Sequence, residues 1–353
     1  MNEIGEGNIK VRSLGLTPDD QARVSTIFYR NLPASRQRII DELPKPELSD
    51  IQRAELLTIE VAARGFLVDK MRRLDIDKPE SRLPNIIYSA PSGEEDQSHA
   101  GYIRQLVGLP VVMVHPDRIT SFDLGLTIMH ELSHASTTTE TRMDFRKADG
   151  DIAKVKSNVP MGFAIAGGSE KSIGRGIENG LAIMDEVDFF NGFLKDHYPK
   201  DYQRRVDGIG PKFIRDRTEK ISHKRFGSPL TVEEYASFIT LTDQRIPIIG
   251  KWIAVPGQNE TLLKQYILTR ELCRAVGRKI VSGDEEALPE NQLVQKGRDH
   301  LDVERYKREN NAHRTIIDIY GGKDAKVIFK VDDHGVGIDE ALRIVVGKES
   351  KTG

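Results

Sequence analysis

Apolar residues recur at helical spacing over residues 17–73. The residues that carry this pattern are Val24, Ile27, Phe28, Leu56, Leu57, Val61 and Phe66. Apolar side chains three or four positions apart lie on one face of a helix, and that face packs against a core. Prolines at positions 33, 44 and 46 separate the pattern into segments. We therefore predict an N-terminal helical region over residues 1–80.

The pattern changes to short runs of β-branched and aromatic residues after Pro84. The runs are Ile86–Tyr88, Gly101–Ile103 and Val111–Val114. Runs of this length and composition favour β-strands, so three strands of a small sheet are expected here. The run at Gly101–Ile103 is either the edge strand of that sheet or an interior strand.

Residues 126–136 read LTIMHELSHAS and are predicted to form a helix. Thr120 and Asp123 resemble the start of a capping box, and the residues that follow are apolar on nearly every side, as in a buried helix. The apolar residues are Phe122, Leu124, Leu126, Ile128, Met129 and Leu132. Polar side chains on such a helix need partners, because burying an unpaired charge is costly.

The polar residues of this helix have the HExxH spacing. His130 and His134 are four positions apart, so their side chains lie on one face, about 5–6 Å apart at Cβ, and can bind one Zn²⁺. Glu131 is rotated from His130 by roughly 100°. Its carboxylate can therefore reach a water on the metal and act as a general base without being a ligand.

The segment LTIMHELSHAS resembles the active-site helix of zincin metallopeptidases. The resemblance is confined to this segment and, more loosely, to residues 176–190. It implies that His130 and His134 are zinc ligands and that Glu131 is the base. It also implies a fold in which the helix packs beneath a small sheet, whose edge strand can pair with an extended peptide.

The third zinc ligand is open at this point. Residues 176–190 resemble the glutamate helix of gluzincins, although the ligand position just before the glycine holds Asn179 and the carboxylate comes one residue earlier, at Glu178. A carboxylate is a far better zinc ligand than an amide, so Glu178 is the predicted ligand. Asp185 is a candidate partner that orients a histidine N–H. Asp144 is the competing ligand, because it lies near where aspzincins carry their aspartate.

The rest of the chain is predicted to be mainly helical. Residues 259–281 carry a long apolar stripe. Residues 292–314 mix basic and acidic side chains, which favours a solvated helix over a nucleic-acid contact. Lys326–Val331 has the composition of a strand. The expected domains are the N-terminal helical region 1–80, a zincin-like metallopeptidase core over residues 81–250 and a mainly helical C-terminal region over residues 251–353.

Composition narrows the partners and the compartment. The 353 residues carry a net charge of −2, which gives no reason to expect a nucleic-acid or membrane partner. The single cysteine, Cys273, excludes an internal disulfide framework, and its apolar neighbours indicate a core residue rather than a nucleophile. No secretory signal or membrane span is visible in the sequence, so we expect a cytoplasmic protein.

Together these features predict an α+β fold: a helix-rich, zincin-like metallopeptidase with a small mixed sheet ahead of the active-site helix. The expected function is hydrolysis of peptide bonds in peptides or proteins, with Zn²⁺ as cofactor and Glu131 as base; the oligomeric state is left open. The alternative is a non-catalytic metal-binding sensor or protein-interaction module. The intact Glu131 favours the enzyme, because a structural zinc site has four protein ligands and no use for a base.

Overall fold

The computed structural model shows two compact units. Unit 1 comprises Met1–Val68 and Asp77–Met161, and unit 2 comprises Asp69–Ile76 and Gly162–Gly353. The three domains expected from the sequence stay a prediction. The structure describes residues 9–14, 16–90, 101–106, 109–116, 120–137, 141–148, 151–158, 163, 165–166, 172–207, 230–237, 258–281, 288–307, 309–332 and 334–349.

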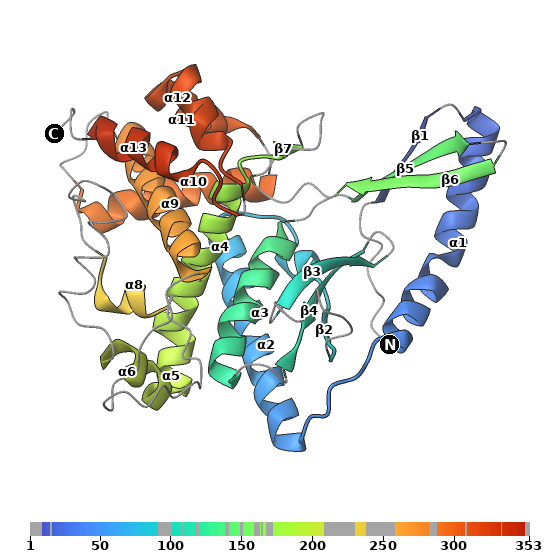
Figure 1. The fold of residues 1–353 in the computed structure, drawn as a ribbon, viewed down its shortest axis with the longest axis horizontal. Helices are drawn as coiled ribbons and strands as arrows, with labels where there is room; N and C mark the ends of the chain where they lie inside the picture. The colour runs from blue at the N-terminus through green and yellow to red at the C-terminus, as the bar shows by residue number, and fades with distance from the viewer. Residues whose placement is uncertain are drawn as a thin grey trace. The chain divides into compact units, whose positions relative to one another are not determined.

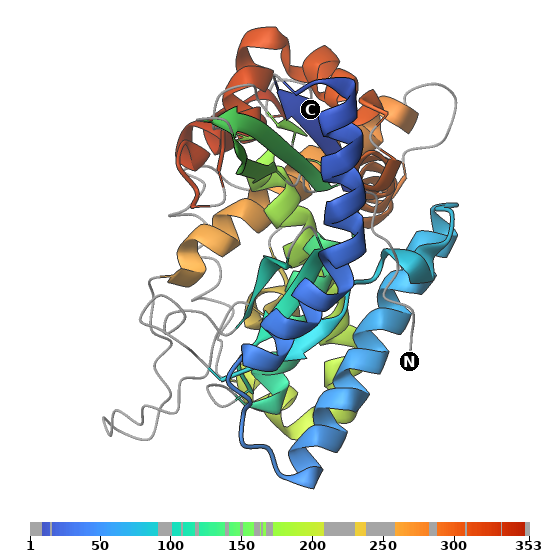
Figure 2. The same ribbon diagram turned by 90° about the vertical axis from the view of Figure 1, so that its right-hand side faces the viewer.

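Two long helices, α1 (Pro18–Glu42) and α2 (Asp50–Arg73), confirm the helical pattern of the N-terminal region. A short 3₁₀ helix, η1 (Pro79–Arg82), follows them. Pro44 and Pro46 lie between α1 and α2, as predicted, whereas Pro33 lies inside α1, which Figure 2 shows as one continuous helix. A proline removes one helical hydrogen bond, but the helix continues because its last two turns pack Ile39 and Ile40 against the sheet of unit 1.

That sheet has three strands, β2 (Ile86–Tyr88), β3 (Gly101–Leu106) and β4 (Leu109–Val114), in the order β2-β4-β3. β2 is parallel to β4 and β3 is antiparallel to it. The three predicted strands and the mixed sheet are confirmed, and the run that begins at Gly101 is at an edge. Helix α3 (Ser121–Ser136) packs on β3 and β4 (Figure 1).

A second sheet of unit 1 was not predicted from the sequence. It contains β1 (Ile9–Leu14), β5 (Thr141–Ala148) and β6 (Asp151–Asn158). β1 pairs with β5 in parallel, and β5 and β6 form an antiparallel pair with a bulge between Asp144 and Phe145. The central strand, β5, therefore pairs with a strand that lies more than one hundred residues earlier in the chain.

Unit 2 is organised around α9 (Gln258–Val281), which contacts α4 (Arg175–Phe189), α10 (Glu290–Lys307), α11 (Asn311–Tyr320) and α13 (Ile338–Glu349). Cys273 in α9 is fully buried, as predicted, and burial raises the pKa of its thiol. At Gly297 the backbone of α10 meets α9 so closely that a Cβ would overlap the carbonyl oxygen of Cys273.

The other elements of unit 2 are shorter. They are β7 (Ile165–Ala166), β8 (Ser172–Ile173), the π-helix η4 (Phe190–Leu194), α5 (Lys195–His197), α6 (Pro199–Asp207), α8 (Val232–Ala236) and α12 (Gly322–Phe329). The strand predicted at Lys326–Val331 is wrong, since most of it lies in α12. Ala325, Ile328 and Phe329 are buried at helical spacing, and this packing outweighs the β-branched composition. The helix-rich α+β character is confirmed.

Candidate active-site helix

Helix α3 begins and ends where its sequence specifies. The hydroxyl oxygen of Thr120 accepts a hydrogen bond from Asp123 N at 3.2 Å, and the same hydroxyl donates to Asp123 Oδ2 at 2.8 Å. Ser121 Oγ donates to Glu55 Oε2 of α2 at 2.7 Å, which ties the first turn to unit 1. At the other end Thr137 Oγ1 donates to the carbonyl oxygen of His134 at 2.7 Å. These hydrogen bonds stabilise the two ends of the helix.

One stripe of α3 is only half-buried. After the first residue, every residue of α3 is buried except Thr127, His130, Glu131 and His134. These positions follow the spacing i, i+3, i+4 and i+7, so they lie along one face. The predicted buried helix is therefore confirmed on its other sides, and the HExxH residues occupy the side that solvent reaches.

The two histidines converge at their Nε2 atoms, which lie 3.2 Å apart. The rings meet edge to face, with centroids 4.6 Å apart and planes at 82°. Nitrogen ligands at about 2.0–2.1 Å from a tetrahedral zinc lie about 3.3 Å from each other. The separation of His130 and His134 therefore fits two ligands of one zinc ion.

Glu131 lies beside the edge strand β3. A Cβ placed on Gly101 would lie 3.6 Å from Glu131 Cγ, 3.1 Å from the carbonyl oxygen of Met113 and only 2.6 Å from Thr127 Cγ2. Gly101 is buried, and only a residue without a side chain fits at this distance from the helix. The strand therefore passes directly against the half-buried stripe of α3.

Glu178, the predicted third ligand, lies in the first turn of α4 in unit 2 and is 3% exposed. Its Oε2 accepts a hydrogen bond from Phe163 N at 2.7 Å, and its Oε1 lies 2.7 Å from Arg305 Nη2. Gly174, which has a φ of 86°, precedes α4 and lies against the ring of Phe163. In unit 2, Glu178 thus neutralises a buried arginine, and its role as a zinc ligand stays a prediction.

Asp185, two turns after Glu178 on the same face of α4, also forms ion pairs in unit 2. Its Oδ1 lies 2.6 Å from Lys70 Nζ and 2.7 Å from Arg298 Nη2, and its Oδ2 lies 3.1 Å from Arg305 Nη1. Lys70 Nζ also lies 2.8 Å from Asp302 Oδ2. Asp185 is fully buried among three cations, and none of these contacts is to a histidine.

These residues form a buried charge cluster, which consists of Lys70, Glu178, Asp185, Arg298, Asp302 and Arg305. Each of the six is at most 4% exposed. Burial is the largest influence on the Asp185 carboxyl and raises its pKa, but the neighbouring cations outweigh it and bring the pKa well below its usual range. Carboxylates in turn raise the pKa of Lys70 and of Arg305 against the effect of burial. In the cluster, the buried basic side chains and the buried acidic side chains therefore compensate one another's charge.

The charge cluster corrects the prediction that residues 292–314 form a solvated helix. Arg298, Asp302 and Arg305 lie at positions i, i+4 and i+7 of α10, so they share one face, and that face is buried. Glu178 and Asp185 have the matching i and i+7 spacing on α4. The two complementary spacings are visible in the sequence and could have indicated the pairing; Lys70, far away in the chain, carries no such signal.

Among the residues that the structure describes, no three His, Cys, Asp or Glu side chains gather as a group able to hold a metal. The structure brings together His130 and His134 of unit 1, while Glu178 and Asp185 are described with their partners in unit 2. Asp144 lies in β5, next to the bulge, and its side chain is outside the described part of the structure.

Comparisons of this chain with protein-family models, with curated proteins and with solved structures gave no match. No helix in the described part of the chain is both long and apolar enough to cross a lipid bilayer.

Proposed function

We propose that this chain is a zinc-dependent peptidase. The observation that carries the proposal is the 3.2 Å separation between the Nε2 atoms of His130 and His134, which suits two ligands of one tetrahedral zinc. Glu131 stands on the same half-buried stripe. The mixed sheet, with α3 packed on it and β3 at its edge, supports a zincin-like architecture.

The residues of unit 1 have separate roles in this proposal. Bound zinc would supply Lewis-acid chemistry, because it polarises a carbonyl and makes a water acidic enough to attack near neutral pH. Glu131 accepts the proton of the attacking water and passes it to the leaving amine. The outer edge of β3 binds an extended peptide as an additional strand. Gly101 lets that strand lie close to Glu131.

Metal analysis tests the ligands. We expect about one zinc per chain in the wild type, and loss of zinc in His130→Ala and in His134→Ala. Glu178→Gln and Asp144→Asn, measured in the same way, identify the third ligand, with Glu178 expected. Undiminished zinc in both histidine variants would contradict the proposal. Loss of zinc in Asp144→Asn alone would leave the histidine pair in place and move the third ligand to Asp144.

Glu131→Gln separates the enzyme from a metal-binding module. The change removes the proton acceptor and keeps the size of the side chain, so cleavage of a peptide library should fall by about 10²–10⁴-fold. Zinc content and the circular dichroism spectrum should not change. The matched control is Glu47→Gln, which alters an exposed carboxylate of the same unit and should cleave as the wild type does. Equal cleavage by Glu131→Gln and the wild type would overturn the mechanism.

A further inference from the structure

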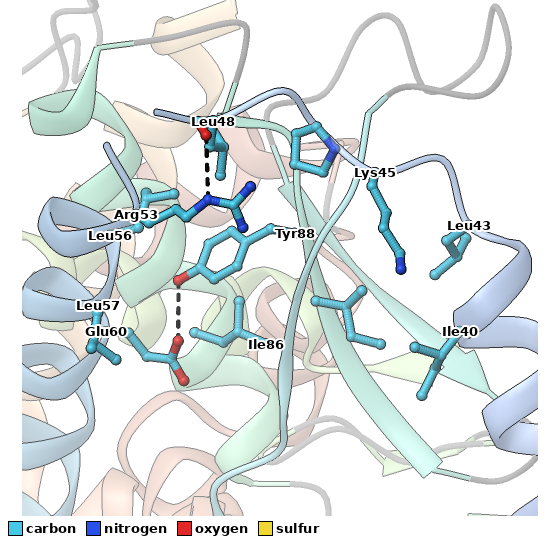
Figure 3. Close-up of a pocket in the computed structure, with 12 residues that line it drawn as sticks. Ile40, Leu43, Lys45, Leu48, Arg53, Leu56, Leu57, Glu60, Ile86 and Tyr88 are labelled. Atoms are coloured by element: carbon cyan, nitrogen blue, oxygen red, sulfur yellow. Dashed lines mark hydrogen bonds between the residues drawn. The ribbon is translucent and has the colours of Figure 1, made fainter. Parts of the chain in front are cut away.

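A groove of about 550 Å³ lies in unit 1 between the end of α1, the start of α2 and strand β2 (Figure 3). It shares no lining residue with the half-buried stripe of α3. Its volume is in the range of about 300–1,000 Å³ that is typical of small-molecule sites. The apolar side chains that line it include Ile40, Leu43, Leu56, Leu57, Ile86 and Ile87. Leu57 is 61% exposed, so the groove opens to solvent.

Two basic side chains, Lys45 and Arg53, line the groove as well. Arg53 Nε donates a hydrogen bond to the carbonyl oxygen of Leu48 at 3.3 Å, which holds the guanidinium at the groove. Among the residues that the structure describes, no hydrogen bond involves its two terminal nitrogens. Lys45 stands between two prolines, Pro44 and Pro46, which restrict the backbone around it. Figure 3 shows both side chains in the upper part of the groove.

The connection that carries Lys45 is anchored to the sheet. The carbonyl oxygen of Pro44 accepts a hydrogen bond from Ala90 N at 2.8 Å, just beyond the end of β2. Proline cannot donate a backbone hydrogen bond, so this connection covers the edge of β2 without extending the sheet. The connection that carries Lys45 is therefore attached to the segment that follows β2.

Glu60 is the one acidic side chain among the described residues that line the groove, and it is already neutralised. Its Oε1 lies 2.8 Å from Arg64 Nε, and its Oε2 accepts a hydrogen bond from the Tyr88 hydroxyl at 3.1 Å. Burial, together with Glu60, raises the pKa of Tyr88, so the hydroxyl keeps its proton. Figure 3 shows Glu60 below the ring of Tyr88, Arg53 beside the upper part of the ring and Lys45 further to the right. The charge left facing the groove is positive.

We propose that the groove binds an amphipathic carboxylate, such as a medium-chain fatty acid. The acyl chain occupies the apolar floor between Leu43, Leu56 and Ile86. The carboxylate binds Arg53, and Lys45, which lies on the opposite side of the groove in Figure 3, adds a second positive charge. Arg53 can bind both carboxylate oxygens through its terminal nitrogens. The site is independent of the peptidase proposal, because it uses none of its residues.

Calorimetric titration of the full-length chain with decanoate, decan-1-ol and decylammonium tests the charge requirement. We expect saturable binding of one decanoate per chain and binding of decylammonium at least tenfold weaker, with decan-1-ol between them. Octanoate should bind roughly tenfold more weakly than decanoate, because two methylenes fewer are buried. Equal binding of decanoate and decylammonium, or uptake that does not saturate, would refute the proposal.

The double variant Lys45→Glu/Arg53→Glu should bind decanoate at least tenfold more weakly than the wild type, since two favourable charge contacts become repulsive. The matched control is Arg23→Glu/Arg38→Glu, which makes the same change in net charge at exposed positions of α1 outside the groove. The control should bind decanoate as the wild type does. An equal loss in both double variants would show a general charge effect and contradict a site at the groove. The ligand series on the wild type decides the question even if the groove variant does not fold.

Discussion

The half-buried stripe of α3 and the charge cluster of unit 2 hold their polar side chains in opposite ways. In the charge cluster, three basic side chains meet three acidic ones, and all six are shielded from solvent. On the stripe, two side chains of the same kind converge within 3.2 Å, and solvent reaches them. Buried charges are tolerated in a fold when they are paired with opposite charges. Convergent, accessible ligands of one type are what a metal site needs.

The stripe and the charge cluster also depend differently on the rest of the molecule. The residues of the stripe all belong to one helix, and Gly101 of β3 approaches that helix closely. The charge cluster combines the last part of α2 with α4 and α10, and removing any one member leaves a buried opposite charge. We therefore expect changes in the stripe to alter chemistry more than stability, and changes in the charge cluster to do the reverse.

The largest effect on stability is expected from Arg305→Met. The change leaves Glu178 and Asp185 with one cation fewer in a buried site, so the free energy of unfolding should fall by about 3–5 kcal/mol. Urea unfolding followed by circular dichroism measures it. Arg314→Met, at an exposed position of α11, is the matched control and should change the free energy by less than about 0.5 kcal/mol. A loss below about 1 kcal/mol in Arg305→Met would show that the charge cluster contributes little.

Gly101→Ala should have an intermediate effect, because the new methyl group overlaps Thr127 Cγ2. Overpacking of this kind costs about 1–3 kcal/mol. Thr127→Ser removes the overlapping methyl group, so the double variant Gly101→Ala/Thr127→Ser should recover much of the loss. The control is Gly65→Ala in α2, where a Cβ meets nothing within 4 Å and the helix should be stabilised. If Thr127→Ser gives no rescue, the close approach of β3 to α3 is not what excludes a side chain.

The smallest effect is the pH dependence that Asp185 contributes. Its pKa in the folded chain is below the unfolded value of about 4, so the ionised group stabilises the fold above that pH, and the contribution is lost as the pH falls toward the folded pKa. The difference in unfolding free energy between the wild type and Asp185→Asn should therefore shrink by about 1 kcal/mol from pH 6 to pH 3. Asp196→Asn, at an exposed position, should show no such change. A difference that is constant with pH would contradict the lowered pKa.

Features that depend on a few neighbouring residues could be predicted from the sequence. The cap at Thr120, the apolar sides of α3 and the spacing of His130 and His134 all lie within one helix, and the structure has them as expected. The three strands of the mixed sheet were likewise marked by composition. In each case the local sequence preference was enough for the prediction, because the packing of the segment in the fold favours the conformation that its own sequence favours.

Features that depend on distant partners could not be predicted in this way. Alternating charges over residues 292–314 are typical of a solvated helix, and the positions of Lys70 and Asp185 explain how charged residues of α10 can be buried. Lys326–Val331 has a strand-like composition, but packing in unit 2 selects a helix for most of it. The continuation of α1 past Pro33 is likewise decided by contacts that Ile39 and Ile40 make later in the helix.

The parallel pairing of β1 with β5 has a consequence for how the chain folds. Ile9 pairs with Thr141, so more than one hundred residues must leave the ribosome before the first strand meets its partner. At about 5–20 residues per second, synthesis of that stretch takes several seconds, far longer than a hairpin such as β5–β6 needs to form. We therefore expect β1 to join a β5–β6 hairpin that already exists. Until then the edges of β1 are unpaired and can pair with other chains, so the nascent protein should be most prone to aggregation during this interval.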